Sequence, residues 1–125
     1  MNTLARSKRE WLIDFFFAFA AGAAIWALSP VIAGTLEPWD SADPLYYHVN
    51  LVVAGLVLGF ARPRGIWMVY PGVLLGQLIY ILLFLPLGPL VVLGAAFLMV
   101  FTLLAPAGAA VAVVTRHLIG KYRAR

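Results

Sequence analysis

Long apolar runs alternate with short polar or turn-forming segments along the whole chain. Four such runs occupy roughly residues 11–33, 45–61, 66–85 and 90–115. A helix of about 20 apolar residues crosses the ~30 Å hydrocarbon core of a bilayer and satisfies its own backbone hydrogen bonds, which lipid cannot do. The pattern therefore predicts an all-α, polytopic membrane protein in which residues 1–125 form a single domain of four transmembrane helices.

Proline and glycine mark places where the predicted helices end or bend. The connection between the second and third runs contains Pro63 and Gly65, and neither residue favours a continuing helix. Within the fourth run, Pro106 cannot donate a hydrogen bond to the carbonyl of Thr102, four residues earlier. We therefore predict a kink in the fourth helix at this point.

The basic residues fall into three clusters that alternate with the apolar runs. The clusters lie within residues 6–9, 62–64 and 116–125, and the two other connections contain neither Lys nor Arg. Cytoplasmic ends of membrane spans carry an excess of Lys and Arg. The pattern predicts that both termini are cytoplasmic, and together with the composition it indicates a multi-pass protein of the cell membrane, in a bacterium the inner membrane.

Composition excludes several other classes of protein. The chain is 64% hydrophobic and 11% charged, whereas roughly a quarter of the residues in soluble domains are charged. The net charge of +4 does not indicate nucleic-acid binding, because orientation already explains the basic clusters. Near an anionic leaflet each such residue contributes ~1 kcal/mol of attraction. The residues expected to contact anionic lipid are Arg62, Arg64, Arg116, Lys121 and Arg123.

Four polar residues within the apolar runs are candidate functional groups. Polar side chains are costly in lipid and usually functional there, and the candidates are Asp14, His48, Asn50 and Gln77. Asp14 has two interpretations: an anchor held by the nearby N-terminal basic cluster and the helix dipole, or a proton or cation site. Gln77 lies in mid-span, where an unpaired amide costs several kcal/mol. It either bonds to another helix or lines a polar path with Tyr70 and Tyr80.

Metal binding and catalysis have little support in the sequence. Glu37, Asp40 and Asp43 precede His48 and are weak candidates for a cation site, but an acidic outer connection is expected from the orientation alone. The chain has no cysteine. Ser29 lies inside a span without a histidine at its predicted depth. We therefore expect no metal, no cofactor and no enzymatic activity.

Small residues recur on the predicted helix faces, where they allow helices to approach closely in a membrane. In the first run, a stripe from Asp14 to Ser29 is expected to face protein, whereas Phe15, Phe19 and Trp26 are expected to face lipid. The glycines expected to pack helices are Gly22, Gly55, Gly59, Gly72, Gly76, Gly94 and Gly108.

Two functional hypotheses follow from these features. In the first, the chain is an accessory or assembly subunit of a larger membrane complex and contacts other membrane subunits through its small-residue helix faces. In the alternative, parallel copies associate into a channel or transporter for an ion or small solute. Its route would be lined by the four polar residues Asp14, His48, Asn50 and Gln77.

Overall fold

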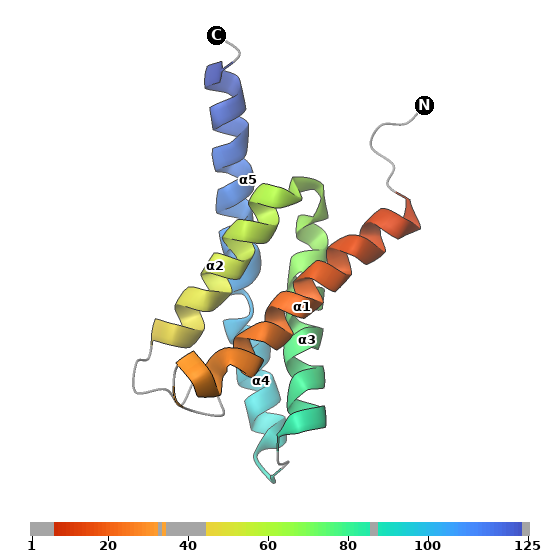
Figure 1. Cartoon of the computed structure of the whole chain (residues 1–125), viewed down its shortest axis with the longest axis vertical. Coiled ribbons are helices and arrows are strands. Elements are labelled where there is room, and N and C mark those ends of the chain that lie inside the picture. Colours follow the sequence, from red (N-terminus) through yellow and green to blue (C-terminus); the bar gives the residue numbers. More distant parts are fainter. Residues whose placement is uncertain (1–6, 33, 35–44, 86–87, 124–125) are drawn as a thin grey trace.

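A computed structural model of the chain describes residues 7–32, 34, 45–85 and 88–123. Every element in these ranges is a helix, which confirms the all-α prediction. Figure 1 shows the elements in chain order: α1 (Lys8–Ile32), α2 (Leu45–Ala61), the 3₁₀ helix η2 (Pro63–Met68), α3 (Val69–Phe84), α4 (Val91–Phe101) and α5 (Leu104–Arg123).

Three stretches of the described chain are long and apolar enough to cross a membrane. They are Lys8–Ile32, Pro63–Phe84 and Val91–Arg123. The second combines η2 with α3, and the third combines α4 with α5. The helix α2 is also apolar but shorter, with 17 residues. These lengths and this composition are those of a membrane protein.

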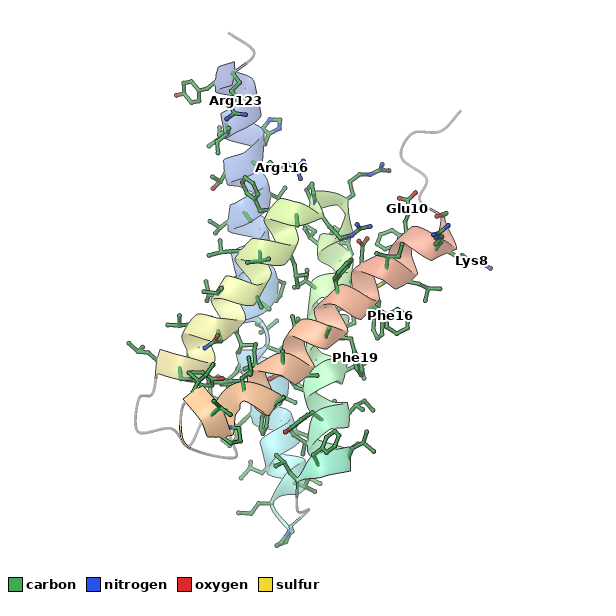
Figure 2. All side chains as sticks on the ribbon, in the orientation of Figure 1. Lys8, Glu10, Phe16, Phe19, Arg116 and Arg123 are labelled. Atoms are coloured by element: carbon green, nitrogen blue, oxygen red, sulfur yellow. The ribbon has the colours of Figure 1, made fainter. Side chains whose placement is uncertain are left out.

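The helices run alternately from one end of the bundle to the other. In Figure 1, α1 begins and α5 ends at the same end, and the connection from α2 into η2 lies there too. The connection from α3 to α4 lies at the opposite end. Figure 2 shows the labelled side chains of Lys8, Arg116 and Arg123 toward the first end. Basic residues from distant parts of the sequence therefore share one end, which we call the basic end.

The bundle consists of two closely packed helix pairs, and the first pair is α1 with α3. Its interface has glycines where the two backbones meet. A Cβ atom added at Gly22 would overlap the backbone carbonyl of Val73, and one added at Gly76 would overlap the carbonyl of Phe19. At Gly72 an added Cβ would overlap the side chain of Ala18. The two helices can therefore approach only because these positions lack side chains.

The second pair is α2 with α5, and its interface has the same character. An added Cβ atom would overlap the backbone of Ala105 at Gly55 and that of Ala109 at Gly59. On α5, an added Cβ at Gly108 would overlap the carbonyl of Val52. Backbone-to-backbone contact thus holds both pairs together, whereas the contacts between one pair and the other are less extensive.

The fourth apolar run is divided into two helices at the predicted kink. α4 ends at Phe101 and α5 begins at Leu104. The carbonyl of Thr102, which Pro106 cannot reach, accepts a hydrogen bond from the nitrogen of Ala105 at 3.0 Å instead. This tighter bond is typical of a 3₁₀ turn. α5 then continues to Arg123, so the expected basic tail after residue 115 is helical at least that far.

One predicted face of the first helix is wrong. Trp26 was expected to face lipid, but its side chain is fully buried. The reason is that the second half of α1 has neighbours on two sides: α3 packs against Gly22, and Tyr46 of α2 bonds to the carbonyl of Ile25. Phe15 and Phe19 are only partly buried, and Phe16 and Phe17 are exposed.

Candidate functional site

The amide of Gln77 is the centre of a buried hydrogen-bond network. Its Oε1 accepts hydrogen bonds from Trp26 Nε1 at 2.9 Å and from the Tyr47 hydroxyl at 2.5 Å. Its Nε2 donates to Thr102 Oγ1 at 2.9 Å and to the carbonyl of Val73 at 3.2 Å. Two acceptor sites and two donor hydrogens are all that an amide side chain possesses. The hydrogen-bonding capacity of Gln77 is therefore fully used.

This network, the Gln77 node, joins four separate segments of the chain. Gln77 lies on α3, Trp26 on α1 and Tyr47 on α2. Thr102 lies in the break between α4 and α5, and its Oγ1 donates onward to the carbonyl of Leu98 at 2.6 Å. All four side chains are fully buried. Since unsatisfied polar groups are costly in an apolar interior, the node favours one arrangement of the two helix pairs.

A second polar contact connects the helix pairs near the basic end. The carboxylate of Asp14 on α1 accepts a hydrogen bond from Nε of Arg62 and forms an ion pair with it. The side chain of Asp14 is 2% exposed and that of Arg62 is 33% exposed. Gly65 packs directly against the carboxylate, because a Cβ atom there would overlap the Asp14 side chain. The guanidinium also lies 5.8 Å from the ring centroid of Phe17.

Three further hydrogen bonds tie side chains to backbone carbonyls of other helices. Tyr46 donates to Ile25 at 3.0 Å, and Tyr70 donates to Met99 at 2.7 Å. Arg116 of α5 donates to the carbonyl of Phe60 at 2.7 Å, in the last turn of α2. Carbonyls in that turn lack partners within their own helix, and a cation is favoured beside them. These bonds fix the register of neighbouring helices.

The four polar candidates of the sequence do not converge on one site. Asp14 belongs to the ion pair and Gln77 to the node. His48 is partly buried and packs edge to face against Phe101, with ring centroids 5.1 Å apart. Asn50 donates to the carbonyl of Tyr46 within its own helix, at 2.7 Å. In place of a shared polar route, Tyr70 is bonded to Met99 and Tyr80 packs its ring on Phe84.

Several residues of these contacts were not singled out from the sequence. Trp26 had been assigned to the lipid face, and Tyr47 had no assigned role. Thr102 was considered only for its backbone carbonyl, to which Pro106 cannot donate, and its hydroxyl was given no role. Their common signal is chemical, because each carries a hydrogen-bonding group inside an apolar run, as Gln77 does.

The basic residues expected to contact anionic lipid have different surroundings. Arg62 and Arg116 bond to Asp14 and to the Phe60 carbonyl. Arg64, Lys121 and Arg123 are exposed. Asp14 thus has an ion-pair partner 48 positions away in the chain, whereas Lys8 and Arg9 of the N-terminal cluster are exposed.

The weak metal candidates Glu37, Asp40 and Asp43 lie outside the described residues. Within the described ranges, no group of three or more His, Cys, Asp or Glu side chains is placed to hold a metal ion. Gly94, expected at a helix interface, lines a pocket between α3 and α4. Comparison of the chain with protein-family models, curated proteins and solved structures finds no match.

Replacement of Gln77 should destabilise the bundle. Gln77→Leu leaves Trp26 Nε1 and the Tyr47 hydroxyl without their acceptor, and we expect a loss of about 1–3 kcal/mol in the free energy of unfolding. Unfolding in mild detergent, followed by circular dichroism during titration with a denaturing detergent, measures this loss. Asn50→Leu is the matched control, since Asn50 bonds only within α2. When Gln77→Leu is combined with Tyr47→Phe, the loss in the free energy of unfolding should be smaller than the sum of the two single losses. Strict additivity would contradict the node.

Removal of Arg62 should cost more than removal of an exposed cation. Arg62→Leu removes the ion pair between Arg62 and the buried carboxylate of Asp14, and loss of one member of a buried ion pair costs up to about 3–5 kcal/mol. The same unfolding assay should show partial recovery when Asp14→Leu is added, because the buried charge is then gone. Lys121→Leu, at an exposed position of α5, serves as the control. Equal stability of the Arg62 and Lys121 variants would show that the ion pair contributes nothing.

Proposed function

We propose that the chain is a four-pass protein of the bacterial inner membrane that acts as an accessory or assembly subunit of a larger membrane complex. The observation that carries this proposal is the use of the interior polar groups. Among the described residues, every buried side-chain nitrogen and oxygen has a hydrogen-bond partner within the chain. Polar groups used in this way hold helices together, which is the requirement of a structural subunit.

The proposed four-pass topology is supported by the arrangement of the helices. The 17 residues of α2 rise about 25 Å, near the lower limit for a transmembrane helix. α2 also packs along α5, the second part of the stretch Val91–Arg123, and leads toward the basic end (Figure 1). Because the basic residues gather at one end, the orientation rule assigns that end, and with it both termini, to the cytoplasm.

A groove on the outer surface of the second helix pair is the proposed contact with another subunit. It has a volume of about 480 Å³ and is lined by Leu56, Val57, Phe60 and Ala61 of α2 and by Ala112 and Thr115 of α5. Ala112 directly continues the small-residue interface formed by Ala105, Gly108 and Ala109. We propose that a transmembrane helix of a partner subunit packs here, because short side chains again allow close approach.

The alternative, a homo-oligomeric channel or transporter, receives less support from the geometry. Its route would use Asp14, His48, Asn50 and Gln77. Asp14 is paired with Arg62, and Gln77 has no hydrogen-bonding capacity left for a solute. A route along these residues would require both contacts to break. We therefore rank the accessory role first.

Native mass spectrometry of the chain after mild extraction tests the accessory role. We expect a hetero-oligomer of fixed stoichiometry. Ala61→Phe, which fills the groove, should weaken this complex roughly five- to 140-fold, since a clash at a packed contact costs about 1–3 kcal/mol. Ala96→Phe places the same side chain at an exposed position of α4 and should leave the complex unchanged. Two results together would favour the channel or transporter: the chain forms only homo-oligomers, and it carries a solute flux in liposomes that Gln77→Leu abolishes.

Labelling of single cysteines tests the proposed topology. The chain contains no cysteine, so each introduced thiol reports one position. A membrane-impermeant maleimide added to intact spheroplasts should label Gly88→Cys, whereas Ser7→Cys and Lys121→Cys should react only after lysis. Labelling of Ser7→Cys and Lys121→Cys from opposite sides, or of Gly88→Cys and Lys121→Cys from the same side, would exclude the four-pass arrangement. Labelling of both Ser7→Cys and Lys121→Cys in intact spheroplasts would reverse the orientation.

A further inference from the structure

An apolar pocket lies between α3 and α4, at the end of the bundle opposite the basic end. Its volume is about 600 Å³, within the range of small-molecule binding sites. One wall is a stripe on α3 formed by Leu78, Ile81, Leu82 and Leu85. Residues of α4 and of the turn that precedes it form the opposite wall. The indole of Trp26 from α1 lies against its inner side.

The packing between α3 and α4 differs from that in the two helix pairs. In the pairs α1–α3 and α2–α5, glycines bring two backbones into contact. α3 and α4 make few contacts, and Gly94 and Ala95 of α4 line the pocket together with the leucine stripe of α3. Space therefore remains between these two helices.

We propose that this pocket binds one acyl chain of a membrane lipid. Among the described residues, the side chains that line it are hydrocarbon except for Trp26, and the indole N–H of Trp26 already donates to Gln77. A ligand there gains burial of apolar surface but no hydrogen bond from a side chain, which suits an alkyl chain and disfavours a polar solute. This proposal does not depend on the accessory role.

The position of the pocket provides a route for a lipid. Leu82 on α3 and Leu93 on α4 line the pocket and are also exposed on the outer surface. In a membrane this surface faces the bilayer, so an acyl chain reaches the pocket sideways without leaving the hydrocarbon region. From Leu78 to Leu85 the wall extends about 10 Å along the helix axis.

Width favours an alkyl chain over a helix of another protein or of a second copy. A helix with its side chains is about 10–12 Å wide. An extended alkyl chain has a cross-section of a single methylene group and enters where a helix does not.

Photolabelling of the purified full-length chain tests the proposal. The protein is reconstituted in phosphatidylcholine vesicles that contain a small fraction of phosphatidylcholine with a diazirine in one acyl chain. After irradiation, mass spectrometry maps the adducts. We expect adducts on residues 78–97 well above those at Phe16, an exposed residue of α1 that lines neither the pocket nor the α2–α5 groove. Ala95→Phe, which fills the pocket, should lower the pocket adducts at least about tenfold, since it removes the burial of several methylene groups.

Two further variants and a measurement of helix content separate filling of the pocket from a general loss of structure. Ala96→Phe adds the same ring at the neighbouring position, which does not line the pocket, and should leave the adducts unchanged. Gly94→Val narrows the space with a smaller side chain and should also lower them. Circular dichroism verifies that each variant retains its helices. Pocket adducts no denser than those at Phe16, pocket adducts unchanged in both filled variants, or crosslinks from the pocket to a second copy would each overturn the proposal.

Discussion

The arrangement of the bundle depends on the demand of one buried amide for hydrogen bonds. Glycine contacts explain why α1 packs on α3 and why α2 packs on α5, but apolar contacts of this kind leave the relative position of the two pairs weakly determined. Gln77 restricts this freedom, because its hydrogen-bond partners come from both sides: Trp26 from the first pair, Tyr47 from the second pair, and Thr102 from the break before α5. Water cannot replace a lost partner in a lipid-facing bundle. Displacement of one pair along the other would leave several buried groups unsatisfied at once.

The break in the fourth apolar run and the Gln77 node share one residue, Thr102. Pro106 frees the carbonyl of Thr102 and forces a tighter turn there, so the helix divides into α4 and α5. The same residue, Thr102, supplies the hydroxyl that accepts from Gln77 and donates to Leu98. The break therefore occurs at the level of the Gln77 node. Beyond it α4 makes few contacts with α3, and the pocket lies between these two helices.

Much of the fold follows from the sequence, but the partners of the polar groups do not. The lengths of the apolar runs and the proline at position 106 predict the helices and the break, because these depend on local chemistry. The requirement of Gln77 for a partner is also local. The identity of the partner is not, since a helical stripe tells which residues share a face but not how many helices enclose it. Trp26 was misassigned for this reason, and the bond from Arg62 to Asp14 joins residues 48 positions apart.

The use of the interior polar groups also determines how such a chain can recognise other molecules. Recognition through hydrogen bonds requires donors or acceptors that are available to a ligand, and the buried side-chain nitrogens and oxygens of the described residues already have hydrogen-bond partners within the chain. What the bundle offers the bilayer is shape: a groove between α2 and α5, and a larger hollow between α3 and α4. Selectivity among hydrocarbon partners then depends on volume and fit, because an alkyl chain and an apolar helix differ little in chemistry but greatly in width. The hydrogen bonds of Gln77 fix the relative positions of the helices that form the groove and the pocket.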